Sequence, residues 1–191
     1  MRDLEIRGAG SLLGEIQSGH LEQVGYDTYC NLLDEVVKEM QGTEIESDID
    51  IQIDLNVTSY IPDEYIEDSA QKIEIYQNIA LCRKEEDIQN VVDEIIDRFG
   101  NMPAELENLL DIARIKYLAK PFSISKIASK RTAVVFTFEQ SKYEIDLQKL
   151  LKTYKNRIKF SPGIKTMITL EIGTTNERQI LNDVTEFLKQ L

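Results

Sequence analysis

Four glycines lie within residues 7–19, and a glycine-rich loop can bind a phosphate or a nucleotide. They are Gly8, Gly10, Gly14 and Gly19. Because glycine costs backbone entropy and packs nothing, this density indicates special backbone angles or a close approach of the backbone to another group. Composition alone favours an irregular surface loop over a loop that cradles a phosphate or nucleotide. A Walker loop and a dinucleotide fingerprint both fit poorly, because no Lys-Ser/Thr pair follows the glycines and no apolar strand precedes them.

Other residue types that commonly catalyse reactions or bind metals are scarce. The single histidine, His20, rules out a histidine-based metal site and leaves little room for a nucleophile–histidine pair. The two cysteines, Cys30 and Cys82, stand in helical patterns far apart in the sequence, so we expect both to be reduced and buried or half-buried. The sequence therefore predicts no catalytic residue, no metal and no cofactor in this chain.

The formal net charge of −12 is divided unevenly along the chain. Residues 1–113 carry 7 Lys and Arg against 27 Asp and Glu, whereas residues 114–191 carry 15 against 7. An acidic half repels phosphate, while a basic half can meet nucleic acid or an acidic protein surface. A plainer explanation is that the two halves attract each other.

The length of 191 residues allows one or two domains, and a hydrophobic fraction of 42% can support a packed core. No apolar run approaches 18 residues and no signal-peptide pattern opens the chain. We therefore expect a soluble, cytoplasmic protein with no membrane contact.

The hydrophobic pattern predicts a helix and a strand on either side of a domain boundary. Apolar residues at helical spacing predict a helix over residues 26–40, and a short acidic stretch follows it. We place the boundary in that stretch, between domains 1–45 and 46–191. Strict alternation of apolar and polar residues then predicts a strand over 49–57. Alternation turns its aspartates to the solvated face, and the glycine and glutamate of an EF-hand are missing, so a cation site is disfavoured.

Three amphipathic helices are predicted next, over residues 66–80, 85–99 and 103–117. Gly100 ends the second helix, and Pro103 opens the third at its first helical position. Apolar stripes at helical spacing are core in nearly every case, so we assign them no chemistry.

The pattern changes after residue 121. Asn176 is a good helix cap, with Gln179 three residues later as in a capping box. The elements expected here are strands at 124–127 and 134–138, a hairpin partner at 143–145, a helix at 147–154, strands at 158–160 and 168–172, and a final helix from 177 to 191. The whole pattern predicts an α/β (α+β) fold, in which a loop–helix extension precedes a compact mixed domain with helices packed on a small β-sheet.

Two groups of motifs resemble one protein family. The first group is Asp3-Leu4-Glu5-Ile6-Arg7-Gly8-Ala9-Gly10, Leu12-Leu13-Gly14, Gln17-Ser18-Gly19 and Val24-Gly25-Tyr26-Asp27 with Tyr29. It resembles the translocation motif that the RecG helicase shares with the bacterial transcription-repair coupling factors, the Mfd proteins. The second group is Ile61-Pro62 with Tyr65-Ile66, Lys72-Ile73 with Ile75-Tyr76, Glu94-Ile95-Ile96-Asp97-Arg98-Phe99-Gly100 with Pro103, and Asn108-Leu109-Leu110 with Ile112-Ala113. It resembles the C-terminal domain of the coupling factors, which RecG lacks.

The resemblance implies that this chain is a fragment of an ATP-driven translocase on duplex DNA, which displaces stalled RNA polymerase and recruits the excision-repair protein UvrA. The motor lobes that bind ATP and Mg²⁺ are then expected upstream of Met1. With no P-loop of its own, this chain should not hydrolyse ATP alone. By motif matching, the residues implied to couple lobe movement to movement along DNA are Arg7, Gly8, Gly10, Gly14, Gln17 and Gly19.

For residues 46–191 the resemblance implies a regulatory, autoinhibitory domain. It is expected to dock on the N-terminal part of the same parent chain and to cover the surface that UvrA binds. We expect the charges that face this partner to be among the basic residues of the second half: Lys126, Lys130, Arg131, Lys142, Lys149, Lys152, Lys155, Arg157 and Lys159.

The alternative is that the basic C-terminal half is an accessory DNA-binding module. Contact with phosphates would make such binding steeply dependent on salt. No recognisable nucleic-acid motif interleaves aromatic residues with the basic ones, which weighs against this alternative.

Overall fold

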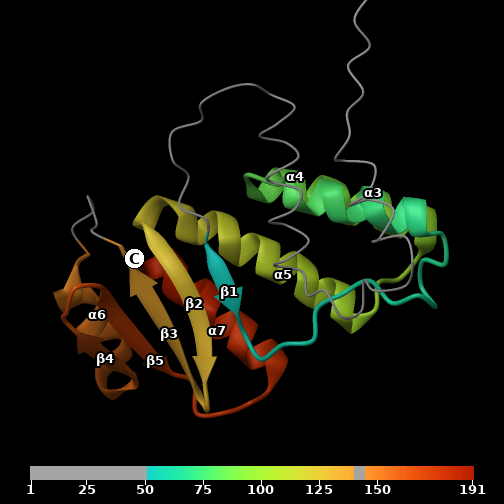
Figure 1. Cartoon of the computed structure of the whole chain (residues 1–191). Helices are drawn as coiled ribbons and strands as arrows, with labels where there is room; N and C mark the ends of the chain where they lie inside the picture. Colours follow the sequence, from blue (N-terminus) through green and yellow to red (C-terminus); the bar gives the residue numbers. More distant parts are fainter. Residues whose placement is uncertain (1–50, 140–144) are drawn as a thin grey trace, which may run out of the picture.

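The computed structural model describes residues 51–139 and 145–191 (Figure 1). The helix predicted over 26–40 and the domain predicted over 1–45 lie outside the described residues. In chain order the helices and strands are β1 (Gln52–Asp54), α3 (Ser69–Ala80), α4 (Glu85–Phe99), α5 (Ala104–Ala119), the 3₁₀ helix η1 (Lys120–Phe122), β2 (Ile124–Lys130), β3 (Ala133–Phe138), α6 (Leu147–Tyr154), the 3₁₀ helix η2 (Lys155–Arg157), β4 (Ile158–Ser161), β5 (Thr166–Glu171) and α7 (Glu177–Gln190).

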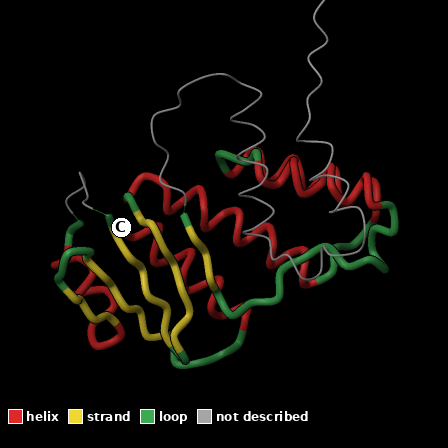
Figure 2. The backbone as a smooth tube through the Cα atoms, in the orientation of Figure 1, coloured by secondary structure: helices red, strands yellow, loops and turns green. Residues whose placement is uncertain are grey.

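The strands form one sheet in the order β1-β2-β3-β5-β4 (Figures 1 and 2). β1 pairs in parallel with β2, with Ile53 opposite Ile127, whereas the other neighbouring strands are antiparallel. A parallel pair needs a crossover connection, and α3, α4 and α5 supply it between β1 and β2. The helices and the sheet therefore belong to one continuous fold.

One face of the sheet carries the first hydrophobic core. Val134, Phe136 and Phe138 are all buried on this face, because side chains two residues apart in a strand point the same way. Phe136 packs on Phe187 of α7, with 4.5 Å between the ring centroids. Helices α5 and α7 lie behind the sheet in Figure 1, and α6 adds Leu150 to the same core.

The second hydrophobic core lies among α3, α4 and α5. Ile75 of α3, Ile95 of α4 and Leu106 of α5 are fully buried in it. Ile61 and Ile66, from the segment between β1 and α3, close one end of this core. Ile66 therefore packs in the core as predicted, but it lies ahead of α3, which begins at Ser69.

Helix α5 belongs to both cores. Leu106 and Leu109 pack among the helices, whereas Ile112 and Ile115 pack against the sheet. A helix that has apolar side chains on opposite sides must bury both sides. α5 buries one side against α3 and α4 and the other side against the sheet.

Local sequence signals set most of the helix ends as predicted. α4 ends before Gly100, whose φ of 85° suits glycine. The Oδ1 atom of Asn176 accepts a hydrogen bond from the backbone N–H of Gln179 at 3.0 Å, which confirms the predicted cap of α7. Pro103 differs from the prediction, because it is the N-cap residue of α5 and not its first helical residue.

Two strand predictions need correction. β1 covers Gln52–Asp54 of the strand predicted over 49–57, because within the described residues 51–57 only these three pair with β2. Residues 49 and 50 lie outside the described part of the chain. β3 has β2 on one side and β5 on the other. Because both edges of β3 are already paired, β3 has no edge left for the hairpin predicted with residues 143–145. Residues 143 and 144 lie outside the described part of the chain.

The cysteine prediction is confirmed for the residue that the structure describes. Cys82 is a buried free thiol just past the end of α3. Burial raises the pKa of this thiol to about 11, and the nearby Asp87 carboxylate acts in the same direction. Among the described helices, none is both long and apolar enough to cross a membrane.

We expect Phe136→Ala to lower the free energy of unfolding by about 3–5 kcal/mol, because it leaves a cavity between the sheet and α7. Urea unfolding of the wild type and the variant measures this difference. Phe160→Ala is the matched control, since Phe160 points to the same sheet face but is 43% exposed on β4. Equal losses in the two variants would contradict the assignment of this core.

Candidate interaction surface

The six residues of the predicted translocation motif lie outside the described residues. Lys142, one of the predicted docking charges, also lies outside them. Their roles therefore remain predictions. The other eight predicted docking charges are described, and the structure divides them into groups with different surroundings.

Three of these charges lie on the sheet face opposite the first core. Lys126 stands beside Thr137, whereas Lys159 stands beside Thr169 in the next row of the same face. Lys130 is in the row after that, beside Ala133. Strands β3 and β5 separate β2 from β4, so about 14 Å lies between the backbones that carry Lys126 and Lys159. These lysines share a face without forming one tight cluster, and Arg131 extends the group from the exposed β2–β3 turn.

Two of the predicted docking charges are used inside the fold. Arg157 donates from Nε to the backbone oxygen of Glu171 at 2.9 Å and from Nη2 to Asp183 of α7 at 2.5 Å. Lys149 donates from Nζ to the backbone oxygen of Gln190 at 2.8 Å. Because these two side chains tie β5 and α6 to α7, we expect them to contribute less to a partner than the sequence suggested.

Three lysines at the α6–β4 end of the sheet remain exposed. They are Lys152, Lys155 and Lys159. None of them makes an ion pair with another described residue. An exposed cation that no described acid neutralises is available to an acidic surface.

The two halves of the sequence meet through a cluster of charges that sequence reasoning missed. Arg114 of α5 donates from Nη2 to Glu85 of α4 at 2.6 Å and also pairs with the buried Asp111. Arg178 of α7 reaches the other oxygen of Asp111 at 2.5 Å. Tyr117 donates its hydroxyl to Glu85 at 2.8 Å. The cluster joins α4, α5 and α7, and its sequence signal was a single acid, Asp111, within an otherwise apolar stretch of α5.

This cluster shifts the pKa values of its members. Hydrogen bonds from Arg114, and then from Tyr117, hold the pKa of Glu85 below its ordinary value of 4.5. Burial raises the pKa of Tyr117 to about 12, and the hydrogen bond to Glu85 acts in the same direction. Both shifts favour the protonation states that hold the cluster together at neutral pH.

A second polar cluster fixes the chain where it leaves β1. Glu177, at the start of α7, accepts hydrogen bonds from the backbone N–H of Thr58 at 3.1 Å and from its hydroxyl at 2.8 Å. Asn108 of α5 donates to the backbone oxygen of Thr58 at 2.9 Å and to Glu177 at 3.1 Å. The link from the sheet to the helices is therefore held by side chains of α5 and α7.

Sequence reasoning also assigned no role to Lys72, which is only 6% exposed. It pairs with Asp63 and so carries a charge to the edge of the helical core. The spacing of Lys72 in the sequence could have indicated its burial. It stands three and four residues before the buried Ile75 and Tyr76, and so lies on the same side of α3.

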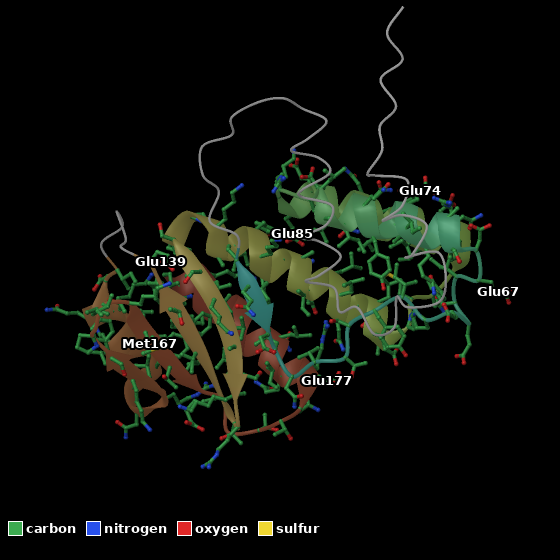
Figure 3. All side chains as sticks on the ribbon, in the orientation of Figure 1. Glu67, Glu74, Glu85, Glu139, Met167 and Glu177 are labelled. Atoms are coloured by element: carbon green, nitrogen blue, oxygen red, sulfur yellow. The ribbon has the colours of Figure 1, made fainter. Side chains whose placement is uncertain are left out.

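Folding separates acidic and basic surfaces. Residues 58–113 carry 14 Asp and Glu against 4 Lys and Arg, whereas residues 147–167 carry 6 Lys and Arg and no acid. Figure 3 shows Glu74 on α3 and Glu67 on the loop before it, both away from Met167 on the sheet. Among the described residues, Arg114 and Arg178 form ion pairs that join the two halves of the sequence. The described residues also hold no group of three or more His, Cys, Asp or Glu side chains arranged for a metal ion.

A family model described as the TRCF domain matches residues 55–150. The chain belongs to the TRCF domain family. The matched residues include all three crossover helices and the strands β2 and β3, and they end in α6.

Curated relatives agree with this assignment. The transcription-repair-coupling factor of Bacillus subtilis is 36% identical over 197 residues, which cover 100% of this chain and 17% of that protein. The factor of Staphylococcus epidermidis is 43% identical over 136 residues, covering 70% of this chain and 12% of that protein. The factor of Staphylococcus aureus is 44% identical over 132 residues, covering 68% of this chain and 11% of that protein. The chain thus spans less than a fifth of the length of these relatives.

A solved structure has the same fold. The crystal structure of the C-terminal domain of a transcription-repair coupling factor superposes with a TM-score of 0.67 at 24% sequence identity. The match covers 74% of this chain and 91% of that one. The α/β fold class predicted from the sequence is confirmed, with helices packed on a small mixed sheet.

We expect Glu85→Gln to remove part of the acid sensitivity of the TRCF domain. Because the folded state lowers the pKa of Glu85, this carboxylate adds stability above pH 4.5, and that stability is lost as the pH falls through its folded-state pKa. The difference in free energy of unfolding between the wild type and the variant should therefore be largest near pH 7 and shrink below pH 4.5. Urea unfolding at a series of pH values measures it.

Glu67→Gln is the control for this prediction, because Glu67 is exposed and makes no ion pair with another described residue. A constant difference between wild type and Glu85→Gln down to pH 3 would show that Glu85 acts through packing and not through its charge.

Proposed function

We propose that this chain is a segment of a transcription-repair coupling factor, and that its parent is an ATP-driven translocase on duplex DNA. In this proposal the parent displaces stalled RNA polymerase and recruits UvrA, and it works in the cytoplasm. The observation that carries the proposal is the family match over residues 55–150, together with 36% identity to the Bacillus subtilis factor along the whole chain. ATP and Mg²⁺ would bind in motor lobes elsewhere in the parent, so this chain would not be an ATPase by itself.

Residues 1–45 would contribute the coupling of motor movement to DNA. The proposal rests on the motif match of Arg7 and Gln17 and on the glycines around them. Arginine can pair with a phosphate or carboxylate through its fork of donors, and glutamine can bridge backbone and DNA.

The TRCF domain itself would act as an autoinhibitory docking domain. It would cover the UvrA-docking region in the N-terminal part of the parent until the motor engages. Two features of the domain support this role. The polar clusters around Asp111 and Glu177 tie its helices to its sheet, so it can dock as one body. Lys152, Lys155 and Lys159 are exposed cations that no described acid neutralises, and they could pair with an acidic surface on the partner.

The second candidate function is an accessory DNA-binding module. The observation that favours it is the shared sheet face of Lys126, Lys130 and Lys159, which Arg131 extends. The two functions predict different critical residues, because docking would use the α6–β4 end whereas DNA binding would use the β2–β3 end as well.

We expect the chain to bind the separately expressed N-terminal region of the parent in a saturable manner, measured by calorimetric titration. Reversing the charges of Lys152, Lys155 and Lys159 to Glu should weaken this binding about tenfold or more at low salt, because attraction becomes repulsion. The matched control reverses the charges of Lys126, Lys130 and Arg131, which changes the net charge equally at the other end of the sheet, and it should retain the affinity.

A DNA duplex titrated in parallel decides between the two candidates. Binding to the duplex that falls steeply with salt and is lost in the Lys126/Lys130/Arg131 variant, with no binding to the N-terminal region, would overturn docking in favour of the DNA module.

A further inference from the structure

Most of the exposed apolar side chains of the described domain belong to its basic stretch, residues 147–167. In the described part of the chain, eight large hydrophobic residues are exposed, and five of them lie within residues 147–167. Leu151 of α6 is 54% exposed, Phe160 of β4 is 43% exposed, and Ile164 in the β4–β5 turn is fully exposed. The same 21-residue stretch carries 6 Lys and Arg and no acid. Ordinary surfaces scatter apolar residues singly and mix both signs of charge, so this combination marks an interaction surface.

The outer edge of β4 lies within this surface. β4 is the last strand in the sheet order, and no described backbone group other than those of β5 pairs with it. Lys159, Phe160 and Ser161 are all exposed, although successive residues of a strand point to opposite faces. Solvent therefore reaches the side chains on both faces of β4. Its outer edge, which no described strand pairs with, offers N–H and C=O groups to another strand.

The side chains along β4 specify what such a strand should carry. Phe160 lies in one row with the buried Ile168 and Phe136, so the residue added beside Phe160 continues an apolar row. Lys159 lies on the other face, so the residue added beside it meets an ammonium group that no described acid neutralises. Neighbouring residues across a strand pair contribute most when apolar meets apolar and acid meets base.

We propose that the α6–β4 surface captures an extended protein segment in which apolar and acidic residues alternate, and that this segment adds to the sheet as a sixth strand along the outer edge of β4. Its apolar residues cover Phe160 and approach Leu151 on α6, and its acidic residues face Lys159 and the neighbouring lysines. The inference rests on the proposed function only in assigning a protein, and not DNA, to this end of the domain.

Two other classes of partner fit the surface less well. An anionic membrane would accept the basic and apolar side chains, but it would leave the backbone groups of the β4 edge without partners in an apolar layer. A DNA duplex would pair with the lysines, but it offers nothing to aliphatic side chains such as Ile164 and Leu151.

The test uses the full chain and synthetic fluorescent peptides. The probe alternates isoleucine and aspartate over eight residues, and a peptide of the same composition with the isoleucines and aspartates in separate blocks is its control. Anisotropy should show saturable binding of the alternating probe and at least about tenfold weaker binding of the block control. Amide hydrogen exchange should slow at β4 when the alternating probe is bound, because strand addition engages backbone N–H groups.

Charge exchange tests the contact directly. Lys159→Glu should weaken binding of the aspartate probe about tenfold. The same variant should bind a probe that alternates isoleucine and lysine, which the wild type should not bind. Lys130→Glu, which makes the same charge change on β2, should have no effect on either probe. Phe160→Asp should abolish binding of the aspartate probe, and circular dichroism checks that this variant remains folded.

Three results would overturn the inference: equal binding of the alternating and block peptides, unchanged exchange at β4 with the probe bound, or binding only to phosphatidylserine vesicles or to duplex DNA. The proposed function fails separately. If the peptide is captured but the N-terminal region of the parent does not bind, docking is wrong and strand capture stands.

Discussion

The fold depends on the burial of one helix on two opposite sides. α5 turns Leu106 and Leu109 to the helical core and Ile112 and Ile115 to the sheet core. Both cores depend on it, because α3 and α4 bury their apolar side chains against one side of α5 and the sheet packs on the other side together with α7. Burying both sides of a helix removes its apolar surface from water, and this gain offsets the entropy of ordering a long crossover between β1 and β2.

Polar groups then fix how the two cores sit against each other. Asp111 receives Arg114 from its own helix and Arg178 from α7, while Asn108 and Glu177 hold the chain that leaves β1. An apolar contact surface tolerates sliding, whereas buried polar groups lose their partners if the helices shift, which costs about 1–3 kcal/mol for each group. These clusters therefore favour a single arrangement of helices and sheet.

The use of charge inside the fold decides which charges remain for partners. Arg114, Arg178 and Arg157 form internal ion pairs, whereas Lys152 and Lys159 do not pair with described residues. For these residues the pattern agrees with the chemistry of the side chains, because the planar guanidinium group suits fixed pairs and the hydrated ammonium group suits exposed positions. Lys72, which is buried and pairs with Asp63, is an exception. The basic end that remains is also the end where no described strand pairs with the outer edge of β4.

The sequence by itself determined the local elements and the family. Gly100 ends α4, Asn176 caps α7, and alternation along β3 predicts its buried face, because each of these signals acts within a few residues. The translocation motif is likewise a matter of sequence alone, since Arg7 and the other motif residues lie outside the described residues.

The tertiary structure alone decided the parallel pairing of β1 with β2, the burial of Lys72 and the division of basic residues into internal and exposed groups. Periodicity reports that a face is buried but not what covers it. The parallel pairing and the ion pairs of Arg157 and Arg178 join residues 26 to 74 positions apart, as Gln52 with Lys126 and Arg157 with Asp183. Their free energy comes from contacts that exist only once the whole chain has packed.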